Sequence, residues 1–334
     1  MPGVRDRGEK IRDFILTNLA ENKNFAALTS QRFGISLPAV YKHIDRLVSE
    51  NLVTKKSGRY VIQSKQHKYT YEIEKALSED AVWEKDIKKH FAGTPENIKS
   101  IWVYGFLEIF NNAIEHSRGE KIRVTVSENR KFAAISISDD GIGIFNNIKE
   151  KFNLVDEKDA LLELAKGKRT TDSKRHSGQG IFFTSKVFDD FVIISNGIVF
   201  AAQQKSSNQA KSERNKSSTF VYMSLKKSSS KKLKAVFDKY STEVPGDFDK
   251  TIVPVHLANS SDLVSRSQAR RILSGLELFK EVTLDFKGVV YIGQAFADEI
   301  FRVFSNMNPN TLIMAQNTNT EVQNMISRAK NTRL

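Results

Sequence analysis

Residues 108–116 read Glu-Ile-Phe-Asn-Asn-Ala-Ile-Glu-His, and this stretch constrains the chain more than any other. Glu108 and Asn112 are four residues apart, so on a helix, which turns by about 100° per residue, they lie on one face, one turn apart. Asn is a poor helix former, so two adjacent asparagines in an otherwise apolar helix suggest a role in holding a ligand. Two later motifs, Asp139-Asp-Gly-Ile-Gly143 and Ser177-Gly-Gln-Gly180, are further candidates for contacts with the same ligand.

The composition narrows the class of protein. The chain has 334 residues, which indicates two or three domains rather than one core. Its formal charge of +13 favours a polyanionic partner, either nucleic acid or nucleotide phosphate, although a basic surface without such a partner stays open. Cysteine is absent, which excludes disulfides and thiolate metal sites and fits a reducing compartment. There is neither a run of eighteen apolar residues nor an apolar signal segment, so we expect a cytoplasmic protein without a membrane partner.

The first 65 residues predict helix, helix, turn, helix and hairpin, in that order. Apolar residues recur at helical spacing over residues 11–19 and 25–33, and a turn follows at Gly34. A third helix is expected over residues 37–50 with Ser36 as its N-cap, and residues 52–62 are expected to form two short strands around a Ser-Gly turn. The side chains that the third helix is expected to turn inward are Val40, Ile44, Leu47 and Val48.

This order resembles a winged helix-turn-helix, and residues 36–47 resemble the recognition helix of many bacterial winged-helix regulators. The resemblance implies that polar residues of that helix meet phosphates and base edges in a major groove, while basic residues of the wing follow the DNA backbone. These residues are Ser36, Tyr41, Lys42, His43 and Arg46 on the helix and Lys55, Lys56 and Arg59 on the wing. The basic residues fall on the two elements that would touch DNA, so we expect DNA binding, while protein binding by this unit stays open.

Residues 66–100 connect this unit to the next one. Charges spaced among apolar residues predict a helix over residues 69–90, a break follows at Gly93-Thr-Pro-Glu96, and another helix is expected to begin near Pro95. Two roles stay open for the connector. It is either a rigid link that changes the spacing of DNA-binding units or a cover for the sheet of the next domain.

The central segment, up to residue 228, carries the candidate ligand-binding motifs. Strands are expected over residues 121–128 and 131–138, and the second delivers Asp139, whose carboxylate can accept a hydrogen bond from an amine such as adenine N6. Gly141 and Gly143 would let the backbone approach a flat ligand closely. A long basic loop is expected over residues 156–176, and a helix opens after Ser177. Further strands are expected over residues 191–195, 197–202 and 217–225.

Taken in order, these motifs resemble the GHKL ATPase family, which includes gyrase, the heat-shock chaperones, histidine kinases and mismatch-repair ATPases. The Asn-Ala-Ile-Glu-His run is most similar to the bacterial anti-sigma-factor serine kinases, and the resemblance covers most of residues 95–225. It implies an α/β sandwich with a mixed sheet that binds ATP and Mg²⁺. Because no His-Glu-x-x-x-Pro-type phosphoacceptor helix precedes this segment, a standard sensor histidine kinase is not expected.

The same resemblance implies roles for single residues. Glu108 matches the general base that activates water or a hydroxyl, and Asn112 matches the Mg²⁺ ligand. Asp139 matches the residue that reads adenine. On the adenine side, the resemblance implies close-approach glycines at Gly141 and Gly143 and a threonine near a bound water at Thr219. On the phosphate side, it implies phosphate-loop glycines at Gly178 and Gly180. The candidates for phosphate contacts from the lid are Lys168, Arg169, Lys174 and Arg175.

Residues 235–334 predict a small α/β domain, in which strands over residues 251–256, 281–286 and 312–314 alternate with helices. The run Leu-Asp-Phe-Lys-Gly-Val-Val-Tyr-Ile-Gly-Gln-Ala-Phe resembles the STAS domain of anti-sigma antagonists. Phosphorylatable STAS domains carry Asp-Ser-Ser-Gly at this turn, whereas the position of the acceptor serine is Ala295 here, which has no hydroxyl. We therefore expect this domain to dock on the nucleotide domain or on a partner without phosphorylation at that turn. A helix over residues 265–276 is expected to carry a basic face of Arg266, Arg270 and Arg271.

These expectations combine into a multidomain α+β chain with a winged helix over residues 1–65, a connector and GHKL domain over residues 66–228, and a STAS-like domain over residues 235–334. The function they favour is an ATP-responsive, DNA-binding transcriptional regulator. Two alternatives stay open: a serine/threonine protein kinase of the anti-sigma type that acts on a separate protein, and a scaffold that binds ATP without hydrolysis. If the chain is an enzyme, its expected activity is either a Mg-dependent ATPase or a protein kinase. The expected partners are DNA and, through the STAS-like domain, a protein, and a homodimer also stays open.

Overall fold

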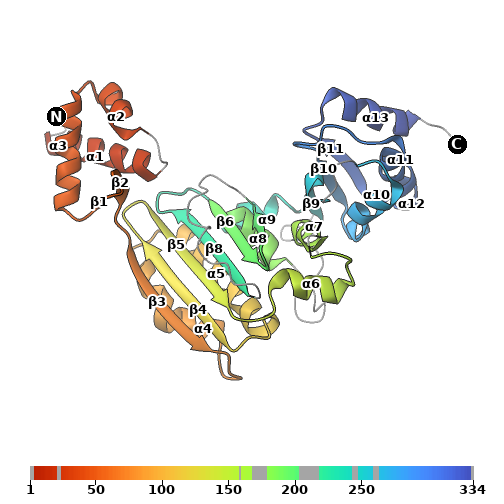
Figure 1. Cartoon of the computed structure of the whole chain (residues 1–334), viewed down its shortest axis with the longest axis horizontal. Coiled ribbons are helices and arrows are strands. Elements are labelled where there is room, and N and C mark those ends of the chain that lie inside the picture. Colours follow the sequence, from red (N-terminus) through yellow and green to blue (C-terminus); the bar gives the residue numbers. More distant parts are fainter. Residues whose placement is uncertain are drawn as a thin grey trace.

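The computed structural model describes residues 4–20, 24–157, 159–167, 179–202, 218–242, 247–258 and 263–331. Three units follow one another along the chain and along the long axis of the molecule (Figure 1): an N-terminal unit up to Ile62, a central unit built on a large sheet, and a C-terminal unit from Lys250. Buried apolar side chains form one cluster in each unit. The multidomain α+β class is therefore confirmed.

The N-terminal unit packs three helices over a hairpin. Its elements are α1 Val4–Ala20, α2 Phe25–Phe33, α3 Leu37–Ser49, β1 Val53–Lys56 and β2 Arg59–Ile62. Helix α2 ends at Gly34, whose φ of 61° is the left-handed conformation that glycine adopts most easily. Val40, Ile44 and Leu47 of α3 are fully buried. The predicted element order and the apolar side of α3 are thus confirmed.

Two details of α3 differ from expectation. Val48 is 38 % exposed rather than buried, because it follows Leu47 directly and therefore points about 100° away from it around the helix. Ser36 occupies the N-cap position, but in the described part of the chain its side chain makes no capping hydrogen bond. Pro38, in the first turn, has no backbone N–H, which removes one of the donors that a cap could use.

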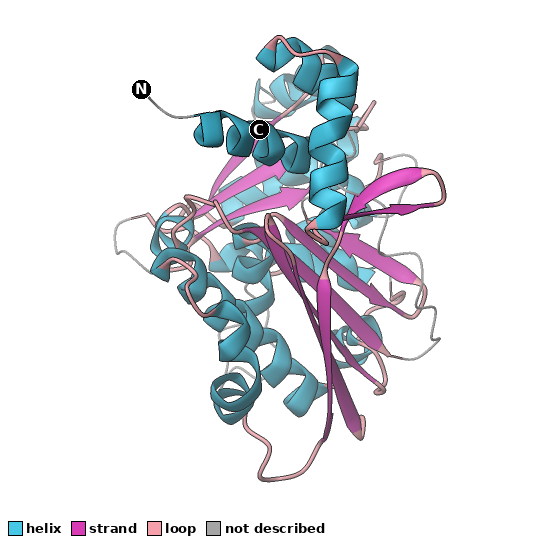
Figure 2. Ribbon diagram, turned by 90° about the vertical axis from the view of Figure 1, so that its left-hand side faces the viewer, coloured by secondary structure: helices cyan, strands magenta, loops and turns pink. Residues whose placement is uncertain are grey.

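The central unit is a two-layer sandwich in which helices lie against one face of a six-stranded sheet (Figure 2). The strand order is β3-β4-β5-β8-β6-β7. The strands are β3 Lys65–Glu72, β4 Lys121–Glu128, β5 Phe132–Asp139, β6 Asp190–Ser195, β7 Ile198–Ala201 and β8 Thr219–Lys226. Strands β4 and β5 set Val124 opposite Ile137, so the buried residues of both strands face the helices together.

Each pair of neighbouring strands described in this sheet is antiparallel, so the expectation of a mixed sheet is wrong. The reason is the position of β8, which pairs antiparallel with both β5 and β6. Strands β5 and β6 consequently run in the same direction but are not neighbours. Asn196 and Gly197 join β6 to β7, and their φ values of 52° and 77° form the predicted Asn-Gly hairpin turn.

The helices of the central unit are α4 Glu79–Val82, η1 Trp83–Ile87, η2 Lys88–Phe91, α5 Glu96–His116, α6 Ile144–Phe152, α7 Asp159–Lys166 and α8 Gly180–Val187. Residues 69–72 belong to β3 and residues 73–78 are not helical, so the helix expected over residues 69–90 is wrong before Glu79. Tyr69 and Tyr71 alternate with exposed residues at the period of two that is typical of a strand. Trp83 and Phe91 share one apolar cluster with the sheet, so the short helices of the connector cover the sheet.

The long loop expected over residues 156–176 is wrong in its first part, because residues 159–166 form α7. Ala160, Leu162 and Ala165 of this helix are buried against neighbouring elements. The helix was not predicted because charged residues lie between these buried ones, and its stability comes from tertiary contacts. The rest of the basic segment, residues 168–178, lies outside the described residues.

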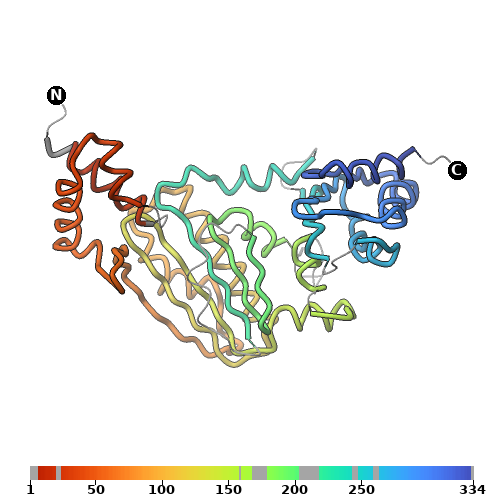
Figure 3. Tube along the Cα trace, turned by 45° about the horizontal axis from the view of Figure 1, so that its top comes forward, coloured from red at the N-terminus to blue at the C-terminus, as the bar shows by residue number. Residues whose placement is uncertain are grey.

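Helix α9 Leu233–Asp238 runs beside the central unit toward the C-terminal unit (Figure 3). The three strands of that unit are parallel in the order β11-β10-β9, with β9 Lys250–Pro254, β10 Glu281–Asp285 and β11 Leu312–Gln316. Its helices are η3 Val255–Ala258, α10 Arg266–Leu273, η4 Leu276–Leu278, α11 Gln294–Asp298, η5 Glu299–Phe304, α12 Ser305–Met307 and α13 Thr320–Asn331. The predicted alternation of strands and helices is confirmed. None of the described helices is both long and apolar enough to cross a membrane.

Candidate functional site

Helix α5 carries Glu108 and Asn112 on one face, as their spacing predicts. Both side chains are half-buried, whereas Ile109 and Ala113 beside them are buried in the apolar cluster of the central unit. The apolar side of α5 therefore fixes the helix on the sheet and determines which way the polar pair points.

Helix α8 begins directly against Glu108. A Cβ atom placed on Gly180 would lie 1.9 Å from Glu108 Oε2, so a side chain fits there only if the carboxylate moves. Farther along the two helices, a Cβ on Gly105 of α5 would lie 2.4 Å from Cε2 of Phe188. Glycines at these two points let α5 and α8 pack closely and bring the expected phosphate-loop residue to the expected base.

Tyr104 lies one turn before Glu108 on α5. Burial raises the pKa of the Tyr104 hydroxyl, and the negative charge of Glu108 raises it further. A neutral phenol therefore lies near the carboxylate at neutral pH. No sequence motif singled out Tyr104, although the spacing 104, 108, 112 places it in the same row as the other two.

Asp139 ends strand β5 as a buried carboxylate with 6 % exposure. Its Oδ1 accepts hydrogen bonds from the backbone N–H of Gly141 at 3.0 Å and of Thr219 at 3.3 Å. Burial raises the pKa of Asp139 above its usual value, and these hydrogen bonds partly oppose the rise. The hydroxyl of Thr219 in turn accepts from the N–H of Ile144 at 3.0 Å. These bonds connect β5, β8 and the start of α6.

The two glycines after Asp139 touch protein atoms, whereas the sequence suggested close approach to a ligand. A Cβ on Gly141 would lie 2.0 Å from the carbonyl oxygen of Ser117, at the end of α5. Gly143 has a φ of 87°, and a Cβ there would lie 2.4 Å from Oδ1 of Asn196. In the described residues both positions thus require glycine for the packing of the loop against α5 and the β6–β7 turn.

The central and the C-terminal unit each match the model of a known protein family. Residues 83–198, which include Glu108, Asn112, Asp139 and Gly180, match the model of the histidine kinase-like ATPase domain. The central unit is a histidine kinase-like ATPase domain. Residues 268–323 match the model of a STAS-like domain of unknown function (DUF4325). No curated protein matches the chain. The resemblances to GHKL ATPases and to STAS domains are therefore confirmed, and the first of them supports ATP binding.

Gly180→Ala is expected to lower ATP turnover at least tenfold, because the added methyl group displaces the Glu108 carboxylate from its present position. The substitution also improves helix propensity, so lost activity would not reflect a weaker helix. Turnover and thermal unfolding should be measured together. Gly8→Ala is the matched control, since a Cβ there would lie 3.4 Å from the nearest neighbouring atom, Nη1 of Arg12. Unchanged turnover in Gly180→Ala would show that the position of Glu108 does not matter.

Several candidate ATP contacts lie outside the described residues: Lys168, Arg169, Lys174, Arg175 and Gly178. The described helices on either side of them are α7, which ends at Lys166, and α8, which begins at Gly180. Both helices reach into the C-terminal unit. Leu162 of α7 and Phe182 and Phe183 of α8 belong to the apolar cluster of that unit.

Lys166 anchors α7 to the STAS-like domain. Its side chain is 2 % exposed and pairs with Glu163 at 2.8 Å. The same ammonium group donates to the carbonyl oxygens of Arg271 at 3.1 Å and Ser274 at 2.9 Å, at the end of α10. The Thr251 hydroxyl on β9 donates to the Lys166 carbonyl at 2.9 Å. The segment that precedes the expected lid is thus bound to the STAS-like domain by buried polar contacts.

The basic face expected on α10 is largely engaged in ion pairs. Arg266 and Arg270 pair with Glu299 at 3.9 and 2.6 Å, and Arg271 pairs with Asp159 of α7 at 3.1 Å. Ala295 lies in the first turn of α11. These arginines therefore hold elements of the protein together.

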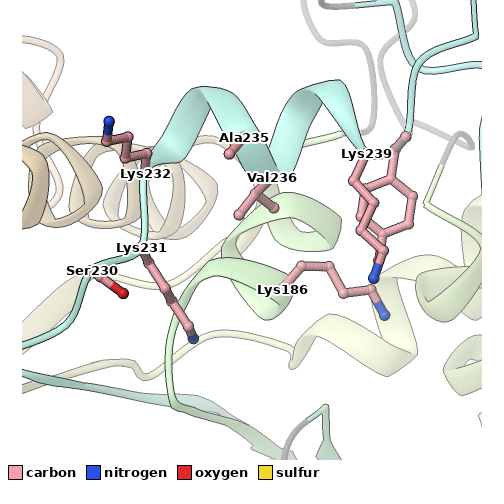
Figure 4. Close-up of a pocket in the computed structure, with 8 residues that line it drawn as sticks. Lys186, Ser230, Lys231, Lys232, Ala235, Val236 and Lys239 are labelled. Carbon is pink, nitrogen blue, oxygen red and sulfur yellow. The ribbon is translucent and has the colours of Figure 1, made fainter.

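A cavity of about 350 Å³ lies between α8 and α9 where the ATPase domain meets the C-terminal unit (Figure 4). Its lining includes the side chains of Lys186, Lys231, Lys232 and Lys239. Lys231 donates to the carbonyl oxygens of Val187 and Phe188, both at 2.9 Å, and so satisfies the end of α8. Burial, together with the charge of Lys239, lowers the pKa of Lys186 to about 8.

Lys186→Met is expected to stabilise the protein at pH 7. The pKa of Lys186 is lower in the folded state than its usual 10.5, so the charged form costs roughly 3 kcal/mol of stability below pH 8. That cost declines as the pH rises from 8 toward 10.5, because the folded protein then holds Lys186 neutral. Thermal unfolding at pH 7 and pH 9.5 should therefore show a gain that shrinks at the higher pH. Lys232→Met, at an exposed position of the same cavity, is the control. An equal gain at both pH values would contradict the titration of Lys186.

The DNA-contact candidates lie on the surface of the N-terminal unit. Those with exposed side chains are Ser36, Tyr41, Lys42, Arg46, Lys55, Lys56 and Arg59, whereas His43 is half-buried. Burial and the charges of Arg12 and Arg46 lower the pKa of His43, so its imidazole is neutral at pH 7. Arg46 pairs with Glu50 at 2.9 Å. The exposed side chains of α3 and the hairpin are therefore accessible to a partner, and the neutral His43 adds no positive charge to this surface.

Proposed function

We propose that this chain is an ATP-responsive, DNA-binding transcriptional regulator whose ATPase domain binds and hydrolyses Mg-ATP. The observation that carries the proposal is the contact of Glu108 with the start of α8 at Gly180 inside a histidine kinase-like ATPase domain. A module that only binds ATP has no need for a carboxylate at this point. Hydrolysis needs a base within reach of the attacking water.

The side chains around Glu108 fit Mg-ATP. Asn112 offers a half-buried carboxamide oxygen one turn away, and hard oxygen ligands are those that Mg²⁺ prefers. The backbone N–H groups of Gly141 and Thr219 hold the Asp139 carboxylate at Oδ1, and this carboxylate is proposed to accept from the amine of adenine. Bound Mg²⁺ would neutralise phosphate charge, while Glu108 would orient the attacking water and take its proton. Gly178, Gly180, Lys168 and Arg169 are the proposed phosphate contacts.

The N-terminal unit is proposed to bind DNA as a winged helix. Lys42 and Arg46 on α3 and the basic residues of the hairpin give adjoining elements a positive, exposed surface. Such a surface fits a helix in the major groove with the wing on the phosphate backbone. The net charge of +13 favours the same kind of partner.

The STAS-like domain is proposed to transmit or restrain the nucleotide state. Its contacts with α7 and α8 support this role, because these helices flank the segment that carries the lid candidates. A lid that orders around the γ-phosphate would pull on both helices. The C-terminal unit would register that change through Lys166 and through the aromatic side chains of α8.

Labelled ATP tests the chemistry of this proposal. The full chain is incubated with Mg²⁺ and ATP labelled at the γ-phosphate, and label is followed both as released phosphate and on protein. Release to water is expected. Asn112→Ala should abolish release, whereas Asn111→Ala, its neighbour on the same helix, should not. Transfer of label to a protein would replace the proposal with a protein kinase of the anti-sigma type.

Selection from a random duplex library tests the DNA part. The full chain should enrich a common sequence, and the affinity for that sequence should change when ATP and Mg²⁺ are added. Lys42→Ala combined with Arg46→Ala should lower the affinity at least tenfold, whereas Lys287→Ala, exposed on the C-terminal unit, should not. No enrichment, or an affinity independent of α3, would exclude DNA recognition by this surface.

A further inference from the structure

Two histidines and a glutamate from three different elements meet at the edge of the sheet. His67 lies on β3, Glu128 ends β4, and His90 lies on η2. One ligand atom of each residue lies within 4.8 Å of the ligand atoms of the other two. The start of β3, which carries His67, lies where the ATPase domain adjoins the N-terminal unit (Figure 1).

The strand register explains why the three side chains converge. Strands β3 and β4 pair Lys65 with Glu128 and His67 with Val126, so His67 and Glu128 are diagonal neighbours on one face of the sheet. Helix η2 covers that face and lays the His90 ring 4.3 Å from the His67 ring, measured between ring centres. Nδ1 of His90 lies 3.9 Å from Oε1 of Glu128.

Two further contacts orient the cluster. The hydroxyl of Tyr69 lies 2.7 Å from Nε2 of His90, so that nitrogen can donate to the phenol oxygen while Nδ1 faces Glu128. Lys227 donates to Oε2 of Glu128 at 3.2 Å, which leaves Oε1 on the side of the histidines. A histidine that binds a metal characteristically donates its second ring N–H to an orienting acceptor, and Tyr69 is placed for this role.

We propose that His67, His90 and Glu128 bind one Zn²⁺ ion, with water as the fourth ligand. Two imidazoles and one carboxylate are a donor set that suits Zn²⁺, and a chain without cysteine can hold this metal only through nitrogen and oxygen. Around a tetrahedral zinc the ligand atoms lie roughly 3.4 Å apart, given metal–ligand distances of about 2.0–2.2 Å. The ligand atoms of the cluster lie within 4.8 Å of one another, and rotation of the exposed His67 side chain can shorten its distances to the other two toward the tetrahedral spacing.

The site would fix the connection between the N-terminal unit and the ATPase domain. Strand β3 begins at Lys65, directly after the hairpin strand that ends at Ile62. Asp13 of α1 already pairs with Lys131 at 3.4 Å, and Asn129 donates to Ser64 at 3.3 Å, across the same junction. A zinc ion that joins β3 to η2 would hold the first residues of β3 in place and restrict movement of the proposed DNA-binding unit.

Zinc titration of the full chain without an affinity tag tests the proposal. Calorimetry should give one Zn²⁺ per chain with a dissociation constant in the micromolar range or below, and Co²⁺ should give visible absorption bands at the same stoichiometry. His67→Ala, at an exposed position that folding does not need, should weaken binding at least tenfold. His256→Ala, an exposed histidine in the C-terminal unit, is the matched control and should bind normally.

Tyr69→Phe separates an oriented site from a chance cluster. Loss of the phenol oxygen should weaken Zn²⁺ binding by about 10–100-fold without removing a ligand. His90→Ala should abolish binding, with circular dichroism confirming that the chain remains folded. The absence of stoichiometric binding by the wild type, or equal affinity in wild type and His67→Ala, would overturn the proposal.

Discussion

Glu108→Gln is expected to lower ATP turnover at least 100-fold while ATP affinity stays within about threefold of the wild type. The amide keeps the size of the side chain and its place against Gly180, but it cannot take a proton from water. Turnover at saturating ATP and the dissociation constant of ATP are the two measurements. Loss of turnover with retained binding is the signature of a missing base.

The control for this substitution lies on the same helix. Glu96→Gln changes the same chemical group in the first turn of α5, where the carboxylate is 81 % exposed and lies 3.8 Å from the ammonium group of Lys99. We expect no effect on turnover. If Glu108→Gln also turns over ATP normally, the proposal that Glu108 acts as the base is wrong, whatever the result for DNA.

Lys166→Met is expected to destabilise the protein by about 3–5 kcal/mol, because it leaves the buried Glu163 carboxylate without its cationic partner. The midpoint of thermal unfolding should fall by roughly 10 °C, and amide exchange should increase in α10 and β9, where Lys166 makes its other contacts. Calorimetry and hydrogen exchange of the full chain measure the two effects.

A double substitution makes this second prediction specific. Combining Lys166→Met with Glu163→Leu removes both buried charges, so stability should recover relative to the single substitution. Lys234→Ala is a useful comparison, since the side chains of Lys234 and Asp238 are 76 % and 41 % exposed and their ion pair should contribute far less. A single substitution with wild-type stability would show that the Lys166 contacts are not what holds α7.

Local sequence patterns correctly predicted the elements whose conformation is encoded in the spacing of their own residues. The spacing of α3 and α5 gave the correct apolar faces apart from Val48, and the Asn-Gly pair at 196 and 197 formed the predicted turn. Strand β3 was missed because residues 69–90 carry charges spaced among apolar residues, and this pattern resembles an amphipathic helix. Its strand conformation follows from pairing with β4, whose paired residues lie 49 to 63 positions later in the chain.

The candidate site was predictable to a similar extent. Glu108, Asn112, Asp139 and Gly180 could be named from their motifs, but their neighbours could not. The approach of Gly180 to Glu108 depends on the crossing of α5 and α8, which a short-range pattern does not encode. The same holds for Lys166, which reads as one more charge in a basic segment yet is buried against residues more than one hundred positions later.

Helix α8 has a consequence for the modularity of this protein. Its first residue packs against Glu108, while Phe182 and Phe183 are in contact with the aromatic rings of Tyr240 and Phe248. A shortened chain that ended after β8 would lose those rings and leave two large aromatic side chains in water. Such a fragment would tend to aggregate even though its sheet is complete. Exchange during evolution of the part of the chain after β8, which includes Tyr240, Phe248 and the C-terminal unit, therefore requires a replacement that covers the same two phenylalanines.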